Sequence, residues 1–366
     1  MRPLFTFCLA LLAALGSAQG LGGVPAPLWS RFKTGVNVTR WFCYVNEAGP
    51  DHYRNYLTEQ DFAEFKRLHV SFVRLCISPN LIYDNGAINA ATLPYVDAAL
   101  DRFQKAGIAV LWDLHDNGQL KLDQTGYDNS GFIKFWEAAA THYKGQRENE
   151  IVFELVNEPQ FPRNADVWYQ LQEQTVKAVR AIDPRRTIMV SSNGYNGIDT
   201  FLKMPPLAES NLIYTFHCYD PFFFTHQGAS WAGDQPKLLK NVPFPSSPEA
   251  VSAMIAVVPE PVRGTLTWYG QQRYDASWLQ KRIATAADWG KSHGVPVVFG
   301  EFGSYPPVAP VQSRERWFAA MRAAIDSAHL PYAIWGYDDA MGLGRTVQSD
   351  GTIKLDPVTL GSFYKQ

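Results

Sequence analysis

The chain has 366 residues, of which 46% are hydrophobic and 19% charged, enough apolar material for one large core. Its formal net charge is -2 and it has no long run of lysine and arginine, which argues against a nucleic-acid or polybasic membrane-binding protein. We therefore expect a neutral partner. The 11 tryptophans and 17 tyrosines supply flat amphipathic rings that can stack on the apolar faces of sugars.

The N-terminus has the pattern of a secretory signal. Arg2 precedes an apolar run over residues 4–15, and the small residues 16–18 follow as a cleavage site. We therefore predict a signal peptide over residues 1–18. No later segment is long and apolar enough to span a bilayer, so we expect a secreted or periplasmic monomer that does not bind the membrane.

Three cysteines follow the signal, namely Cys43, Cys76 and Cys218. An odd number specifies no disulfide framework, and the sequence leaves open whether Cys43 and Cys76 pair. No Cys-x-x-Cys motif occurs, which argues against thiol redox chemistry and a structural zinc site.

Short apolar or β-branched runs then alternate with longer amphipathic segments, the pattern typical of parallel strands joined by helices. Eight runs are candidate strands, at residues 34–38, 71–77, 108–115, 151–157, 187–191, 212–219, 295–301 and 332–336.

Helix ends are visible between these runs. Thr58 followed by Asp61 predicts an N-cap, and residues 164–182 have an approximately helical rhythm of apolar positions. Asp275 precedes another helical run, and Gly294 is suited to end it.

Eight strand and helix units predict an α/β fold, a single-domain (β/α)8 TIM barrel over residues 24–366. The competing doubly wound sheet lacks its strongest signal, a Gly-x-Gly-x-x-Gly turn between an early strand and helix. The alternation is interrupted at about residues 220–274, which contain several prolines and aromatic residues. We expect this long insert to form a wall of the active-site cleft.

Side chains at the C-terminal ends of barrel strands point into the active site. The polar and aromatic residues that close the predicted strands are therefore the candidate site residues. They are Arg74, His115, Asn157, Glu158, His217, Tyr219, Glu301 and Trp335.

Two of these candidates are glutamates that close different strands. Hydrolysis of a glycosidic bond requires one carboxyl group to protonate the leaving oxygen and another to attack or to activate water, so Glu158 and Glu301 form a suitable pair. Asp113 and Glu154 lie inside strands, where we expect them to hydrogen-bond to site residues rather than to react.

The motifs around these residues carry a family resemblance. They are Phe72-Val73-Arg74, Asn157-Glu158-Pro159, His217-x-Tyr219, Val298-Phe299-Gly300-Glu301-Phe302-Gly303 and Trp335. In this order and on these strands they resemble the barrel enzymes of glycoside hydrolase family 5, from about residue 35 to residue 335. The resemblance implies a retaining β-glycosidase that cuts a polysaccharide.

The resemblance also implies roles for the site residues. Glu158 would be the acid/base and Glu301 the nucleophile, with Asn157 bonded to the sugar 2-hydroxyl. Arg74 and Tyr219 would flank Glu301 and keep it ionised.

Three further roles follow from the same resemblance. His115 and His217 would shape the subsite that holds the sugar to be cleaved. Trp335 would form the floor beneath that sugar.

The resemblance favours a β-1,4-glucan such as cellulose as the substrate, because residues 216–221 and 224–228 are similar to bacterial cellulase-like members. A β-mannanase is the first alternative, followed by a xyloglucanase or another β-glucanase, because one hydroxyl orientation separates glucose from mannose. A secreted carbohydrate-binding protein without turnover is the alternative of a different class, although it has no need for a matched acid and nucleophile.

We expect no cofactor, because the acid and the nucleophile come from the protein itself. A metal site built from His115-Asp116, His217 and His226 is conceivable. We expect none, because residues 37–39 read Asn-Val-Thr where metal-dependent barrel hydrolases present a His-x-His pair on the first strand.

Overall fold

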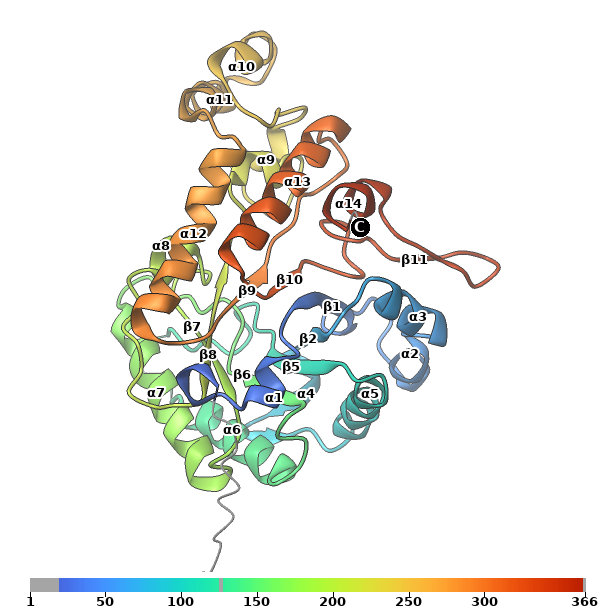
Figure 1. Cartoon of the computed structure of the whole chain (residues 1–366), viewed down its shortest axis with the longest axis vertical. Coiled ribbons are helices and arrows are strands. Elements are labelled where there is room, and N and C mark those ends of the chain that lie inside the picture. Colours follow the sequence, from blue (N-terminus) through green and yellow to red (C-terminus); the bar gives the residue numbers. More distant parts are fainter. Residues whose placement is uncertain (1–19, 125–127, 365–366) are drawn as a thin grey trace, which may run out of the picture.

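The computed structural model describes residues 20–124 and 128–364 (Figure 1). The predicted signal peptide, residues 1–18, lies outside the described residues. No helix in the described ranges combines the length and the apolarity needed to cross a bilayer.

Eight parallel strands close into a barrel, as predicted. In barrel order they are β1 (Thr34–Phe42), β2 (Phe72–Ile77), β5 (Ala109–Leu114), β6 (Ile151–Glu154), β7 (Ile188–Ser191), β8 (Leu212–His217), β9 (Val297–Glu301) and β10 (Tyr332–Ile334). The barrel closes where β10 pairs with β1, with Thr34 opposite Tyr332 and Val36 opposite Ile334. Two small antiparallel hairpins lie outside it, β3 (Tyr83–Asp84) with β4 (Ala87–Ile88) and β11 (Thr346–Val347) with β12 (Ile353–Lys354).

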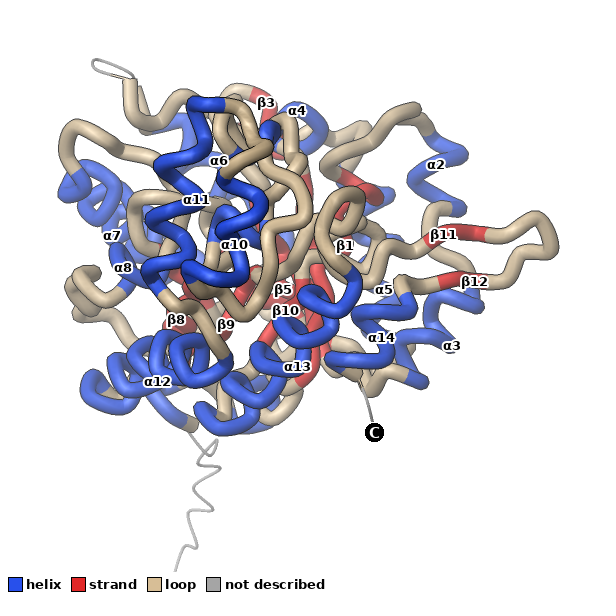
Figure 2. Tube along the Cα trace, turned by 90° about the horizontal axis from the view of Figure 1, so that it is seen from above, coloured by secondary structure: helices blue, strands red, loops and turns tan. Residues whose placement is uncertain are grey.

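Helices surround the barrel (Figure 2). The longer ones are α3 (Glu59–Arg67), α5 (Leu93–Lys105), α6 (Ser130–Tyr143), α7 (Ala165–Ile182), α10 (Pro248–Ile255), α11 (Glu260–Gln272), α12 (Ala276–His293) and α13 (Val311–Ala328). The shorter ones are α1 (Ala26–Trp29), α2 (Pro50–Asn55), α4 (Pro79–Ile82), α8 (Ile198–Phe201), α9 (Phe222–Thr225), α14 (Pro357–Phe363), η1 (Leu21–Gly23) and η2 (Pro236–Leu238).

The predicted helix ends lie where the sequence places them. Thr58 and Asp61 form a reciprocal capping box at the start of α3. The Asp275 side chain accepts a hydrogen bond from the Trp278 amide at the start of α12. Gly294, in the left-handed conformation at φ 66°, ends the same helix.

Apolar side chains fill the barrel at its N-terminal end. Phe72, Val152 and Val298 are fully buried inside it and share a cluster with Leu28 and Phe32 from the segment that precedes β1. The Phe32 and Phe72 rings lie 4.7 Å apart. These side chains fill the N-terminal half of the barrel. The open end, where a cleft can form, is therefore at the C-terminal ends of the strands.

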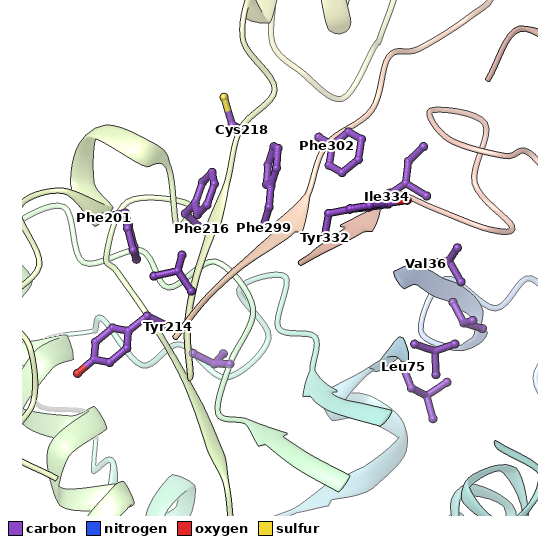
Figure 3. Packing of buried hydrophobic residues seen from close by; sticks show 14 of the residues in the cluster. Val36, Leu75, Phe201, Tyr214, Phe216, Cys218, Phe299, Phe302, Tyr332 and Ile334 are labelled. Carbon is purple, nitrogen blue, oxygen red and sulfur yellow. The ribbon is translucent and has the colours of Figure 1, made fainter. Parts of the chain in front are cut away.

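A larger apolar layer separates the strands from the helices (Figure 3). Phe216 on β8 and Phe299 on β9 stack with ring centroids 4.6 Å apart and an interplanar angle of 11°. Phe216 is next to His217 at the end of β8, and Phe299 lies two residues before Glu301 at the end of β9. The stack therefore fixes the spacing of two strands that carry site residues.

Two predicted features differ in detail. The first strand runs to Phe42 rather than to residue 38, and β6 and β8 end at Glu154 and His217, earlier than predicted. Buried residues that continue the apolar runs beyond the ladder, Leu155 and Val156 after β6 and Cys218 after β8, made the predicted strands too long. The insert after β8 is also more regular than predicted, because it contains the helical pair α10 and α11, which projects at one end of the long axis (Figure 1).

Candidate active site

A cleft of about 1140 Å³ lies at the C-terminal ends of the strands. Seven of the eight predicted site residues line it, namely His115, Asn157, Glu158, His217, Tyr219, Glu301 and Trp335. The eighth, Arg74 on β2, is fully buried beside them.

The guanidinium of Arg74 is the centre of a buried ionic network. Its Nε and Nη2 donate to the two carboxylate oxygens of Glu154 at 2.7 and 2.9 Å, a bidentate pair. Its Nη2 also lies 3.1 Å from Asp113 Oδ2 and donates to Asn157 Oδ1 at 2.8 Å. Its Nη1 donates to Glu301 Oε1 at 2.5 Å. One cation thus orients a carboxylate on each of three other strands.

Asn37 on β1 completes this network. Its Oδ1 accepts a hydrogen bond from Arg74 Nη1 at 3.0 Å, and its Nδ2 donates to the carbonyl oxygens of Gly300 and Ala333 at 3.0 and 3.2 Å. Asn37 is fully buried. It therefore ties Arg74 to the backbone next to Glu301.

Glu301 is held as an oriented carboxyl group at the end of β9. Besides Arg74, the Tyr219 hydroxyl donates to its Oε2 at 2.9 Å, and His217 Nδ1 lies 3.5 Å from the same oxygen. Its side chain is only 5% exposed. Burial raises the pKa of Glu301, while His217 and the positive charge of Arg74 oppose that rise.

Glu158 lies across the cleft and has a different environment. Its Oε1 lies 2.9 Å from His217 Nδ1, and its side chain is 26% exposed. Burial raises the pKa of Glu158 to about 7, although His115 and Arg74 oppose the rise. Its backbone has φ 43°, the left-handed region that is sparsely populated by non-glycine residues and is often found at functional sites.

His217 links the two glutamates. Its Nδ1 and one oxygen from each carboxyl group all lie within 4.8 Å of one another. Burial lowers the pKa of His217 to about 4, so the imidazole is neutral at neutral pH. The residue before Glu301 must be glycine for this contact, because a Cβ on Gly300 would lie 2.5 Å from Thr215 Oγ1 and 3.1 Å from His217 Nε2.

Aromatic side chains pack against one another in the lining of the cleft, namely Tyr44, His115 and Trp335. His115 stacks on Trp335 with centroids 5.3 Å apart, and its Nδ1 lies 2.7 Å from Asp113 Oδ2. Burial lowers the pKa of His115 to about 4. The Tyr44 hydroxyl lies 3.2 Å from His115 Nε2, and the Tyr44 ring stands at 87° to Trp335.

Other lining residues were not among the predicted ones. Arg40 lies near the end of β1, which was predicted too short, and Tyr44 follows that strand by two residues. Tyr195 lies in the loop after β7, and Arg282 on α12 pairs with Asp199 at 2.5 Å. A correct prediction of where the first strand ends would have pointed to Tyr44. Nothing in the sequence around Arg282 indicates a site residue, because it reaches the cleft from a helix.

Cys43, Cys76 and Cys218 are all free thiols in the described structure. Cys76 packs with Trp335 and Met341, which line the cleft, and Cys43 packs against the same cluster. Their pairing, left open by the sequence, is therefore absent here.

Two groups of potential metal ligands occur among the described residues. One consists of Cys76, Asp113 and His115, and the other is Glu158 with His217 and Glu301. Neither includes His226, so the four-residue metal site considered above is not assembled. The first group also adjoins the Arg74 guanidinium, whose charge opposes binding of a cation.

The family model of cellulases, glycosyl hydrolase family 5, matches residues 33–340. The chain belongs to glycoside hydrolase family 5. This family 5 chain is 26% identical over 317 residues to Endoglucanase C of Acetivibrio thermocellus, a match that covers 84% of this chain and 91% of the relative.

Solved structures agree on the fold. Cel5A of Thermotoga maritima in complex with cellobiose superposes with a TM-score of 0.71 at 23% identity, covering 92% of this chain and 99% of that one. The same enzyme in complex with mannotriose superposes with a TM-score of 0.70 at 22% identity, with the same coverage. The family 5 chain is thus a (β/α)8 glycoside hydrolase, in agreement with the resemblance drawn from its motifs.

The environment of Glu158 makes a testable prediction for this glycosidase. In a ¹³C NMR titration of glutamate-labelled protein, one buried carboxyl group should titrate near pH 7, protonated below and ionised above, because burial disfavours its charged form. That signal should be missing in Glu158→Gln. If all glutamate signals titrate below about pH 5, this account of the environment of Glu158 is wrong.

Proposed function

We propose that this family 5 glycosidase is a retaining endo-β-1,4-glucanase in which Glu158 is the acid/base and Glu301 the nucleophile. The observation that supports the proposal is the arrangement of Glu158 and Glu301. Two carboxyl groups, one in the loop after β6 and one at the end of β9, share His217, and only Glu301 also touches the Arg74 guanidinium.

The spacing of the pair supports retention. Retaining enzymes hold their carboxyl groups about 5 to 5.5 Å apart, whereas inverting enzymes need about 6.5 to 9.5 Å to admit a water molecule. Here one carboxylate oxygen of Glu158 and one of Glu301 lie within 4.8 Å of each other, with a nitrogen of His217 within the same distance of both. The gap favours direct attack by one carboxylate on the sugar.

The electrostatics support the division of roles. An acid must keep its proton near neutral pH, which agrees with the raised pKa of Glu158. A nucleophile must be ionised and oriented, and Glu301 receives donors from Arg74 and Tyr219. In the first step Glu301 attacks the anomeric carbon as Glu158 protonates the leaving oxygen. In the second, Glu158 takes a proton from the water that releases the sugar from Glu301.

The extent of the cleft supports action within a chain. On the β1 side of the barrel, Tyr44 and Arg40 also line an adjoining hollow of about 340 Å³. The second half of the cleft lies by β7, opposite β1 in the barrel order, where Tyr195 follows β7 and Arg282 lines the cleft from α12. The second half adjoins the acid/base, because the carbonyl oxygen of Pro159 accepts a hydrogen bond from the Gly194 amide. We assign that half to the leaving-group sugars.

The choice of glucan rests on the relatives. Endoglucanase C is a named endoglucanase, and Thermotoga Cel5A binds cellobiose in one structure. A β-mannanase is the second candidate because Cel5A also appears in complex with mannotriose.

We also propose that the protein is secreted or periplasmic, on the basis of the N-terminal sequence pattern, and that it acts as a monomer.

A substrate panel tests the proposed activity. We expect new reducing ends from carboxymethylcellulose and swollen cellulose and much fewer from mannan and xyloglucan, with a rapid fall in the viscosity of carboxymethylcellulose as internal bonds are cut. A preference for mannan would favour the second candidate. Tight retention on a polysaccharide with no turnover would favour a carbohydrate-binding protein.

Substitution of each glutamate tests the two roles. Glu301→Gln should lose turnover of every substrate, because no nucleophile remains. Glu158→Gln should lose about 10²- to 10⁴-fold on cellulose but retain the first step on dinitrophenyl cellobioside, whose leaving group needs no proton. Azide should accelerate the second step in this variant, because an anion needs no general base.

A glutamate away from the cleft provides the control. Glu173 on α7 is 42% exposed, and Glu173→Gln should keep full activity on both substrates. Full cellulase activity in Glu301→Gln, or equal losses on both substrates in Glu158→Gln, would contradict the assignment.

A further inference from the structure

Exposed aromatic rings are concentrated at the cleft. In the described ranges the exposed aromatic residues are Tyr44, Tyr195, Phe222, Trp231 and Trp268. The first four line the cleft, and Trp268 does not. Trp268, 46% exposed, is thus the one exposed aromatic residue of the described ranges that lies outside the cleft.

Trp268 lies on α11, in the insert that follows β8. Its ring is 6.2 Å from that of Phe223, which is 6.0 Å from that of Phe222 at the edge of the cleft. Two ring-to-ring steps therefore join Trp268 to the wall of the cleft. Figure 1 places α11 next to α9, the helix that carries Phe222 and Phe223.

The insert holds this ring in place. On the same helix, the Tyr269 hydroxyl donates to the Pro243 carbonyl oxygen at 2.7 Å, and Ser246 Oγ donates to the Tyr269 carbonyl oxygen at 3.1 Å. Leu266 and Tyr269 are fully buried. The position of Trp268 relative to the cleft is thus set by buried contacts, which lowers the entropy lost when a ligand binds.

The surroundings of Trp268 fit a neutral sugar. Its neighbours one turn away on the helix are Gly264 and Thr265 on one side and Gln271 and Gln272 on the other. The rings of Phe223 and Tyr274 meet the indole at interplanar angles of 86° and 66°, so neither stacks parallel to it, and the side chain stays exposed. Amides and a hydroxyl can bond sugar hydroxyls, and no charged residue occurs in 264–272.

We propose that Trp268, together with Phe222, forms an outlying binding site for the polysaccharide chain where it leaves the cleft on the leaving-group side. The ligand is a neutral β-glucan that is already engaged at the glutamates. This inference rests on the proposed function. It predicts that the enzyme favours long chains over oligosaccharides too short to reach the insert.

The test compares chain lengths in matched variants. We expect Trp268→Leu, which keeps apolar bulk but loses the flat ring, to lower kcat/KM on swollen cellulose about two- to tenfold. Its kcat/KM on cellotetraose should be unchanged. Trp268→Phe should restore most of the loss. Val257→Ser, at an 81% exposed position between α10 and α11, is the control and should match the wild type on both substrates.

Two results would overturn the inference alone. One is an active Trp268→Leu enzyme with wild-type rates on both substrates, and the other is an equal loss on both, which is what a purely structural role produces. A wild-type enzyme that cleaves neither glucan would contradict the proposed function and this inference together.

Discussion

The buried side chain of Arg74 is the interaction on which the site depends. A single guanidinium without solvent contact bonds Glu154 and Glu301, and it also orients Asn157. Breaking one partner of such a buried pair costs about 3 to 5 kcal/mol, because a charge is left uncompensated. The network therefore couples stability to the geometry of the cleft, because Glu301 both lines the cleft and neutralises a cation in the core.

The same network explains why two glutamates so close together can differ. Arg74 touches Glu301 directly but has no direct bond to Glu158, so its charge favours ionisation of one carboxyl group more than of the other. His217 joins them as a neutral donor or acceptor, since burial lowers its pKa to about 4. Gly300 leaves the space that this imidazole occupies. Asymmetry within a shared pocket is what acid and nucleophile chemistry requires.

Sequence patterns predicted the barrel because each strand is a short apolar run between amphipathic segments, although the ends of β1, β6 and β8 were misplaced. The helix caps at Thr58 and Asp275 were readable for the same reason, as local hydrogen bonds. The two helices of the insert were not predicted, because prolines and aromatics obscured their periodicity. The motifs predicted Glu158 and Glu301 as site residues, and in the structure both line one cleft. A contact such as that of Arg282 depends on how a helix packs, which local sequence does not encode.

Trapping the glycosyl-enzyme intermediate tests the central claim most directly. A 2-deoxy-2-fluoro cellobioside with a dinitrophenyl leaving group slows both steps but keeps the first step feasible, so the covalent species accumulates. Peptide mass spectrometry should then find one fluorosugar attached to the carboxylate of Glu301. An adduct on another residue, or steady turnover with inversion at the anomeric carbon and no adduct, would contradict the account.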